Sequence, residues 1–366
     1  MFEIDFFSQS PETIVQLASE KLRTADEEWE KQIWQFIIDW FNPAITSIKV
    51  FTSGSTGTPK QVTHTKSAMM NSAAATCTAL QLKPGSRALL CLPVNKISGM
   101  MMVVRSIHNK MKLICIRPSS TPLQELTDEQ QIDFAAFTPM QFHGVVTDIN
   151  IFKKANQINK IILGGEDVRA GLLNPIQQLK SEVYITFGMT ETISHIALKR
   201  LNGPKPDINF KVLTGIDISI NDRNCLVISA PALGQSHLVT NDVVKLVGES
   251  EFQWLGRIDN VINSGGVKIQ PEEIEQQLLN LIKYPYFIAS VADKILGEKL
   301  VIALETPMLR PEEKNELVNA FTKLEKLHRP KLILLIPQFA RTENGKIKRM
   351  ESLLKPVETI DLSEKD

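Results

Sequence analysis

Cysteine is scarce in this chain: four cysteines occur in 366 residues, and they are widely spaced. Cys77, Cys91, Cys115 and Cys225 have neither the spacing of a zinc site nor the density of a disulfide framework. The sequence therefore predicts buried, reduced thiols, which are typical of a cytoplasmic protein.

The chain also lacks a net charge, since 41 Lys and Arg residues balance 41 Asp and Glu residues. No overall field draws it to nucleic acid or to an anionic membrane. No apolar stretch approaches the ~20 residues that a membrane-spanning helix needs. The start, MFEIDFFSQS, carries acidic side chains where a secretory signal needs basic ones. We expect a cytoplasmic protein without a membrane span; the sequence leaves its oligomeric state open.

What is present is the composition of an ordinary globular protein, 43% hydrophobic and 22% charged. Apolar residues at three- and four-residue steps predict one helix over residues 11–41. From residue 46, short apolar runs alternate with helix-length segments, which predicts a mostly parallel sheet covered by helices. Its predicted strands are residues 47–52, 88–92, 112–116, 134–137, 161–163 and 183–187.

The pattern changes after residue 194 to short runs that predict antiparallel strands, at residues 195–198, 217–220, 226–229, 243–247 and 252–255. Helix and strand signals then alternate again to the end of the chain. We therefore predict an α/β fold with two domains. The first, residues 1–256, combines the helix-covered sheet with the β-rich segment, and the second, residues 257–366, is a small mobile α+β domain.

The most informative segment is residues 51–60, FTSGSTGTPK, between a predicted strand and a helix expected to begin near His64. Small residues let backbone N–H groups wrap around phosphate oxygens, hydroxyls add donors, and Lys60 adds charge. The glycine spacing differs from that of a Walker loop. The predicted phosphate-binding residues are Thr52, Ser53, Gly54, Ser55, Thr56, Gly57 and Lys60.

This segment resembles the phosphate loop of the adenylate-forming superfamily, which includes acyl-CoA synthetases, luciferases and nonribosomal-peptide adenylation domains. Other segments match the family in order and cover most of the chain from residue 47: residues 184–192 (YITFGMTET), 238–242 (LVTND), 256–260 (GRIDN), 263–268 (NSGGVK) and 341–349 (RTENGKIKR). Five ordered motifs identify the chain as a member of this superfamily.

The resemblance implies where a nucleotide binds. Phe187 stacks on adenine beside Gly188, and Gly164 and Gly165 lie where the family cradles the base. Thr190 contacts phosphate. The same resemblance implies ATP, Mg²⁺ and coenzyme A as the molecules that the protein uses.

The resemblance also implies charged roles that the chemistry explains. A carboxylate that attacks the α-phosphate of ATP brings anion to anion, so cations and oriented donors are needed where charge accumulates. Glu191 supports magnesium, a cation that prefers oxygen ligands. Asp242 binds the ribose hydroxyls, and Arg257 binds ribose or phosphate oxygens. Lys346, in a glycine-containing segment, neutralises the transition state.

The hinge of the family corresponds to Asp259. After acyl-adenylate formation, the small domain of family members rotates about this residue. The segment that then lines the channel for the acceptor thiol corresponds to Gly265, Gly266 and Lys268. The resemblance thus implies two half-reactions: an acid and ATP give an acyl-adenylate, and coenzyme A then displaces AMP.

The chain departs from the family pattern at several positions. Phe187 stands where Tyr is usual, Asn241 replaces a Gly, and Ala340 replaces a Pro. The phosphate loop begins near residue 51, whereas typical members carry a long region before it. We therefore expect a first domain that is shortened at its N-terminus but keeps its catalytic residues.

Residues 92–100, LPVNKISGM, resemble a Leu-Pro-x-x-His-x-Ser-Gly stretch of the family, with Lys96 at the histidine position. A cation there, together with Arg105, is suited to a second carboxylate on the substrate. The chain resembles most the branch that ligates o-succinylbenzoate to coenzyme A in menaquinone synthesis. The candidate substrate residues are Lys96, Ser98, Gly99, Arg105 and Met189.

Three alternatives remain open from the sequence. The acid could be another aryl or fatty acid, or the acceptor could be a carrier protein instead of coenzyme A. A non-catalytic nucleotide-binding protein is the alternative outside the enzymes. The formation of AMP from ATP with a panel of acids separates all of them.

Overall fold

The computed structural model describes residues 1–52, 60–127, 130–165, 168, 170–342, 347–354 and 356–362. Its α-helices are α1 (Pro11–Thr24), α2 (Glu28–Phe41), α3 (Lys66–Ala79), α4 (Ile97–His108), α5 (Pro139–Thr147), α6 (Ile149–Ala155), α7 (Ala170–Gln177), α8 (Pro271–Leu278), α9 (Pro311–Thr322) and α10 (Arg349–Leu353). No helix among the described residues is long and apolar enough to cross a bilayer. The four cysteines are buried thiols, as predicted.

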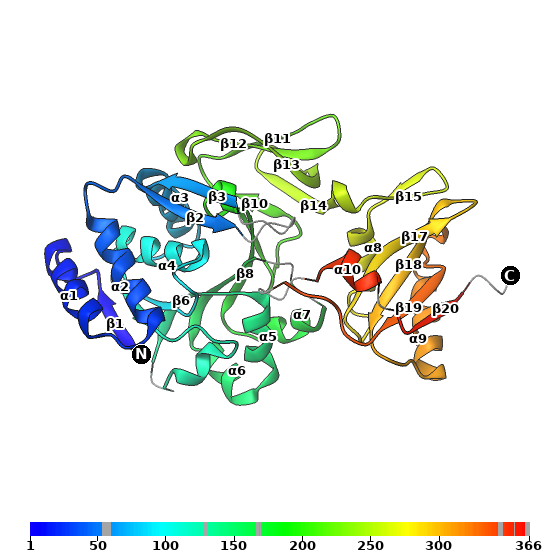
Figure 1. Ribbon diagram of the computed structural model, residues 1–366, viewed down its shortest axis with the longest axis horizontal. Helices are drawn as coiled ribbons and strands as arrows, with labels where there is room; N and C mark the ends of the chain where they lie inside the picture. The colour runs from blue at the N-terminus through cyan, green and yellow to red at the C-terminus, as the bar shows by residue number, and fades with distance from the viewer. Residues whose placement is uncertain are drawn as a thin grey trace.

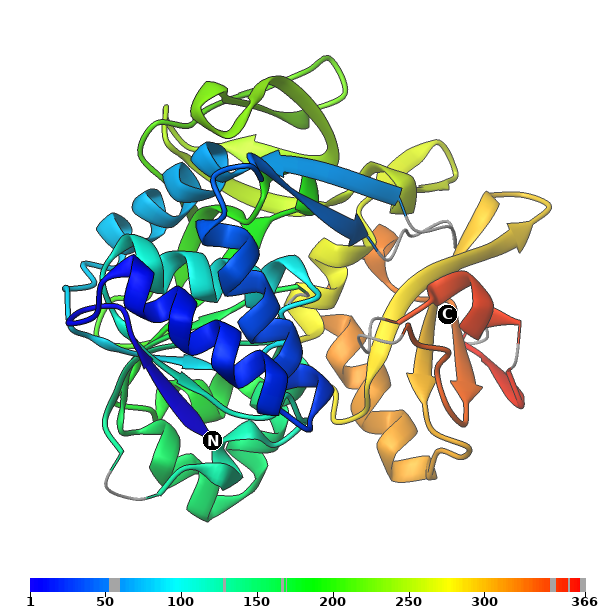
Figure 2. The same cartoon turned by 60° about the vertical axis from the view of Figure 1, so that its left-hand side comes forward.

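The larger part of the molecule is built on a twelve-stranded sheet in the order β1-β5-β4-β6-β7-β8-β9-β10-β14-β13-β12-β11. Helices α3 and α4 cover one side of its parallel strands, and α5, α6 and α7 cover the other (Figures 1 and 2). The predicted helix-covered parallel sheet is confirmed. Its parallel strands are β4 (Arg87–Leu90), β5 (Lys112–Cys115), β6 (Ile132–Phe137), β7 (Ile158–Leu163) and β8 (Glu182–Gly188).

From β8 onward the sheet continues with antiparallel strands, as the change of pattern after residue 194 predicted. A short N-terminal strand, β1 (Phe2–Asp5), pairs antiparallel with β5 at the opposite edge. The antiparallel strands are β9 (His195–Arg200), β10 (Phe210–Val212), β11 (Asp217–Ile220), β12 (Cys225–Ala230), β13 (Gln235–Leu246) and β14 (Glu251–Arg257).

The predicted single helix over residues 11–41 is wrong, because the structure has two helices there. The backbone turns extended at Ala25, whose N–H closes α1 on the Lys21 carbonyl, and α2 starts at Glu28. The two helices pack against each other. This break lets both apolar faces reach one core, where Ile14 of α1 and Ile37 of α2 are each almost fully buried.

The strand predicted at residues 47–52 exists, but it does not belong to the parallel sheet. It forms an antiparallel pair, β2 (Ser47–Thr52) with β3 (Lys60–Thr65). The helix expected near His64 starts instead at Lys66, where the Thr65 side chain accepts the Ala68 N–H. The candidate phosphate loop therefore joins two strands of a hairpin, and does not lead directly into a helix.

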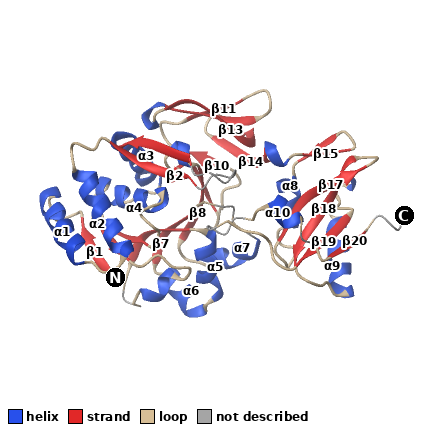
Figure 3. Cartoon of the chain, in the orientation of Figure 1, coloured by secondary structure: helices blue, strands red, loops and turns tan. Residues whose placement is uncertain are grey.

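The C-terminal part has its own sheet, with β18 and β19 at its centre (Figure 3). The buried hydrophobic side chains also form separate clusters: one consists of residues between 4 and 252, and the two others of residues between 262 and 339. The strands are β15 (Ile262–Ser264), β16 (Val267–Ile269), β17 (Tyr286–Asp293), β18 (Gly297–Glu305), β19 (Leu332–Ile336) and β20 (Glu358–Asp361). The division of the chain at 256/257 remains our proposal.

Candidate active site

Several predicted site residues lie just beyond the carboxyl ends of neighbouring parallel strands. Lys96 follows β4, Gly164 follows β7, and Glu191 follows β8. Because parallel strands end at the same edge, the sheet order β4-β6-β7-β8 brings these loops together. Such an edge is where open α/β sheets bind ligands.

Close backbone approaches explain two of the predicted glycines. A Cβ at Gly164 would lie 2.6 Å from the Thr186 Oγ1, which itself donates to the Leu163 carbonyl at 3.1 Å. A Cβ at Gly188 would collide with the Ser194 carbonyl. Both positions therefore need glycine to keep the ends of β7, β8 and β9 in contact.

The segment that carries Thr190 and Glu191 is a fixed 3₁₀ turn, η2 (Thr190–Thr192). The Thr192 hydroxyl donates to the Ser194 carbonyl at 2.8 Å and accepts the Met189 N–H at 3.1 Å. Ile193 follows with φ 68°, an uncommon backbone conformation for a β-branched residue. Backbone strain of this kind persists only where the surrounding contacts impose it. Glu191, in the same turn, is exposed.

Arg105 is the most unusual residue near this edge. It lies on α4 with 2% of its surface exposed, and its Nη2 donates to the Ser194 Oγ at 2.7 Å. Its Nε is buried without a hydrogen-bond partner. No carboxylate of the described residues forms an ion pair with it. Burial lowers the pKa of Arg105 to about 10, so the guanidinium is charged at neutral pH.

The neighbours of Arg105 are neutral. His195 is buried, with Nε2 3.0 Å from the Thr76 Oγ1. Burial, together with the charge of Arg105, holds the pKa of His195 well below its usual range. Burial raises the pKa of Cys77 to about 11 despite the same cation. A charged guanidinium thus lies among groups that do not compensate it.

The other candidate substrate residues line the start of α4 and the end of β8. Lys96 is the N-cap residue of α4 and is partly exposed, and Ser98 in the first turn is exposed. Gly99 is buried, and the Pro93 carbonyl lies so close that a Cβ at this position would collide with it. Met189 precedes η2 and is partly buried.

Phe187, at the end of β8, belongs to a cluster of three aromatic rings. Its ring meets Phe252 edge-on with centroids 5.1 Å apart, and Phe210 at 5.7 Å. Phe210 and Phe252 stack on each other at 5.4 Å. This packing fixes the direction of the Phe187 ring at the end of β8. Gly165, across on β7's loop, has φ 98°, which only glycine adopts readily.

The predicted ribose residues Asp242 and Arg257 lie on β13 and β14, and the predicted hinge residue Asp259 follows β14 in the turn η4 (Ile258–Asn260). Asp242 is the register partner of Arg257, and its carboxylate accepts the Trp254 indole N–H at 2.9 Å. The Asp259 Oδ2 accepts from the Arg257 Nη2 and from the Asn241 Nδ2, both at 3.1 Å. The neighbouring residues Asn241 and Asp242 of β13 thus have different partners: Asp242 bonds to Trp254 within the sheet, and Asn241 bonds to Asp259 in η4.

The predicted thiol-channel residues lie on the C-terminal sheet. Gly265 and Gly266 form the turn between β15 and β16 with φ 59° and 82°, and Lys268 is exposed on β16. Since these residues belong to the other sheet, the structure does not group them with the loops after β4, β7 and β8. The loop residues 53–57 and Lys346 lie outside the described residues, as do the side chains of Thr52 and Lys60.

Two residues outside the predicted site set, His64 and Trp254, contact residues of that set. His64 on β3 is buried, its Nε2 has no hydrogen-bond partner, and its pKa is lowered by burial against a hydrogen bond to the Thr190 backbone. Trp254 contacts Asp242. Both contacts depend on how segments of the chain pair in three dimensions, which the sequence alone does not show.

A cluster of charges lies near the predicted hinge, where α8 contacts both β14 and β17 of the C-terminal sheet. The Glu275 carboxylate accepts the Ile288 N–H at 2.7 Å and the Arg349 Nη2 at 3.0 Å. Glu272 lies 3.6 Å from the same Arg349 group and also accepts from the Asn260 side chain in η4. Arg349 thus forms ion pairs with both Glu272 and Glu275.

We expect the stability of the protein to fall between about pH 4.5 and pH 7 because of Glu275. Burial raises its pKa to about 7 against the opposing effects of Arg349 and the Ile288 N–H. In this interval the unfolded chain releases the proton that the folded chain keeps, so the free energy of unfolding decreases by up to ~1.4 kcal/mol per pH unit. Glu275→Gln is expected to flatten this slope in urea titrations.

The control for this prediction is Glu273→Gln on the same helix, which should leave the slope unchanged. Parallel curves for the wild type and Glu275→Gln would contradict the prediction, since Glu275 would then titrate alike in both states.

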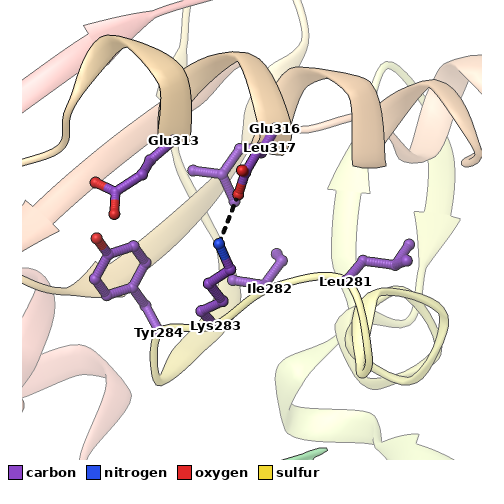
Figure 4. A pocket seen from close by; sticks show the side chains of 7 residues that line it. All are labelled: Leu281, Ile282, Lys283, Tyr284, Glu313, Glu316 and Leu317. Carbon is purple, nitrogen blue, oxygen red and sulfur yellow. Dashed lines mark hydrogen bonds and ion pairs between the residues drawn. The ribbon is translucent and has the colours of Figure 1, made fainter.

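A surface pocket lies elsewhere, between residues 281–284 and α9 (Figure 4). Its charged groups are already paired, with the Lys283 Nζ 3.0 Å from the Glu316 carboxylate and the Tyr284 hydroxyl hydrogen-bonded to Glu313. None of the predicted site residues lines it. The pocket therefore does not mark the candidate active site.

Comparison with known proteins now decides the family. A model of the family described as AMP-binding enzyme matches residues 7–227, more than half of the chain. The chain belongs to the AMP-binding enzyme family. Within this family, a crystal structure of an acyl-CoA synthetase (AMP-forming)/AMP-acid ligase II-like protein from Dyadobacter fermentans is 35% identical, covers 91% of this chain and 97% of that chain, and has a TM-score of 0.63.

Curated members of the AMP-binding enzyme family similar to this chain are acid–thiol ligases. The 2-succinylbenzoate–CoA ligase of Lactococcus lactis is 25% identical, over 82% of this chain and 69% of that protein. The enzyme of the same name from Haemophilus influenzae is 28% identical, over 66% of this chain and 54% of that protein. The chain thus spans between about half and two thirds of their lengths.

A solved family member has the same fold with its nucleotide bound. The O-succinylbenzoate coenzyme A synthetase of Bacillus subtilis, in complex with ATP and magnesium ion, has a TM-score of 0.68. It is 21% identical and covers 83% of this chain and 69% of that chain. This likeness supports the α/β architecture described above.

Proposed function

We propose that this chain activates a carboxylic acid with ATP and transfers the acyl group to coenzyme A. A carboxylate oxygen of the acid attacks the α-phosphorus of ATP and pyrophosphate leaves. The thiol sulfur of coenzyme A then attacks the acyl carbon, and AMP leaves with the electron pair of the broken bond. The acid that the site favours is o-succinylbenzoate, and the protein would work in the cytoplasm.

The observation that carries the choice of acid is Arg105. A buried guanidinium without a carboxylate partner is costly, and proteins keep such a charge where a ligand completes it. The Nε of Arg105 offers a donor to an anion, and the Ser194 hydroxyl, which already accepts from Nη2, lies beside it. A dicarboxylic acid meets this requirement with the carboxylate that is not activated. Partly exposed Lys96 at the start of α4 would add attraction at the entrance.

The described residues also fit the nucleotide. Gly164 and Gly188 let the ends of β7, β8 and β9 approach one another closely, beside Phe187, which would stack on the base. Asp242 would bind the ribose. For Mg²⁺ the exposed Glu191 offers one carboxylate, and the described residues contain no cluster of three metal-binding side chains. This suits a cation held mainly by phosphate oxygens, and the ion would neutralise charge on them.

We also propose that Asp259 is the hinge of a small C-terminal domain formed by residues 257–366. Asn241, which stands where the family has Gly, holds this aspartate together with Arg257. Asn241→Gly is expected to raise the rate of tryptic cleavage after Arg257 by about 2- to 10-fold, the worth of one neutral hydrogen bond. Asn241→Asp should raise the cleavage rate further, because its carboxylate repels Asp259. Equal cleavage rates in the wild type and both variants would contradict the proposal that Asn241 holds Asp259 in place.

The experiment that tests the function is a panel of acids offered with ATP, Mg²⁺ and coenzyme A, with AMP and the thioester measured separately. We expect AMP and a coenzyme A thioester with o-succinylbenzoate and much less of both with benzoate or a fatty acid. A preference for a monocarboxylic acid would point to a different acyl-CoA ligase. AMP release without a thioester would point to a carrier-protein acceptor, and no AMP with any acid would rule out catalysis.

A further inference from the structure

Trp254 makes a hydrogen bond that its position in the chain does not suggest. The indole Nε1 donates to the Asp242 Oδ1 at 2.9 Å. Both side chains are partly buried, and the Trp254 ring packs against the core of the larger part. A buried indole N–H needs an acceptor, and most buried groups find one on the backbone. This indole instead binds the carboxylate of a candidate site residue.

An irregularity in the sheet is what brings the two side chains together. In the antiparallel pair β13–β14, Val243 faces Gly256 but Val244 faces Trp254, so one residue of β14 is extra. In a regular ladder Trp254 would face Lys245 and point to the other side of the sheet from Asp242. The bulge turns the indole to the face that Asp242 occupies. Bulges next to sites commonly redirect a side chain in this way.

Groups on β13 and β14 thus hold Asp242 in place. Its main-chain N–H donates to the Thr240 Oγ1 at 3.1 Å, and the Trp254 indole sets the rotation of the side chain through Oδ1. A ribose diol offers two hydroxyl donors to a carboxylate, and a carboxylate already oriented loses less freedom when it binds them. An indole at this place therefore offers the carboxylate an N–H donor that a phenyl ring lacks.

We propose that Trp254 is a positioning residue for nucleotide binding, which acts by orienting Asp242 toward the vicinal hydroxyls of a ribose; this inference rests on the proposed function. Trp254 itself does not touch the nucleotide. The effect of removing its N–H should therefore appear only with ligands that carry the diol, and only while Asp242 is present.

The test is the binding of AMP and of 2′,3′-dideoxy-AMP, measured by titration calorimetry without any turnover. Trp254→Phe is expected to weaken AMP about tenfold, as for a hydrogen bond to a charged group, and dideoxy-AMP by less than twofold. In an Asp242→Ala background, Trp254→Phe should change neither affinity. Trp29→Phe, which removes an indole stacked on Phe2 at 5.7 Å, is the matched control and should bind as the wild type does.

The results separate this inference from the proposed function. Suppose that the wild type prefers AMP to dideoxy-AMP. The positioning role is overturned if Trp254→Phe keeps that preference in full, or if it weakens the binding of both nucleotides by the same factor. If the wild type binds neither ligand, the proposed function fails and the inference falls with it. Should Trp254→Phe not fold, ¹⁵N-indole labelling of the wild type replaces it: the Trp254 signal must shift with AMP and stay unchanged with dideoxy-AMP.

Discussion

Lys346→Ala is expected to lower the rate of ATP–pyrophosphate exchange by about 10²- to 10³-fold, the usual effect of removing one stabilising group from a charged transition state. The reason is electrostatic, since the attack of a carboxylate on the α-phosphate concentrates negative charge that only cations and oriented donors can stabilise. The described residues on either side of this lysine pair with each other, Arg341 with Ile347 and the Lys348 N–H with the Ala340 carbonyl. The exchange assay isolates the first half-reaction from the second.

The matched control is Lys348→Ala, two residues away. Lys348 is exposed at the N-cap of α10 and pairs with Glu351 of that helix at 3.0 Å, so its loss should leave the exchange rate within about twofold. Full exchange activity in Lys346→Ala would contradict the assignment of Lys346. A loss of equal size in both variants would show that the segment, and not the lysine, matters.

Arg105→Met is expected to lower kcat/KM for o-succinylbenzoate by 10²-fold or more while the protein becomes no less stable. Truncating one partner of a buried charge pair costs about 2–5 kcal/mol of binding, which is the loss expected once the substrate carboxylate has no guanidinium to meet. A monocarboxylic acid such as benzoate makes no such pair, so its lower kcat/KM should change little or improve. Steady-state kinetics with both acids gives the ratio directly.

The stability of the same variant supplies an independent check. Arg105 is buried without a carboxylate partner among the described residues, and replacing such a charge with an apolar side chain of similar length is commonly neutral or stabilising by about 1–4 kcal/mol. Urea unfolding of Arg105→Met should show this, and Arg105→Lys should retain part of the preference for the dicarboxylic acid. If Arg105→Met is less stable and its kcat/KM falls equally for both acids, Arg105 has a role in packing alone.

The sequence was sufficient to predict the features that depend on local pattern. The parallel strands β4 to β8 are short apolar runs between helices, and the structure places them where the alternation predicts. Their shared edge follows from parallel pairing, so residues as far apart in sequence as Lys96 and Glu191 could be assigned to one site. The family itself was identified from the order of short motifs, which needs no tertiary structure.

Features that depend on tertiary pairing could not be predicted in the same way. The strand β3 was missed because its alternation, with Val62 and His64 less exposed than their neighbours, is too short to stand out beside a glycine-rich loop. The break at Ala25 has no proline or glycine to mark it. The contact of Trp254 with Asp242 requires knowledge of a bulge. That Arg105 has no carboxylate partner among the residues that the structure describes is a property of packing, which no motif records.

The most direct test of the account follows the oxygen atoms of the acid. The purified protein is given ATP, Mg²⁺, coenzyme A and o-succinylbenzoate whose carboxyl groups carry ¹⁸O, and the AMP is analysed by mass spectrometry. The account predicts that each AMP contains one ¹⁸O atom, because a carboxylate oxygen becomes bound to the α-phosphorus and stays there when the thiol takes the acyl group. AMP without label, or ADP and phosphate as the products, would contradict it.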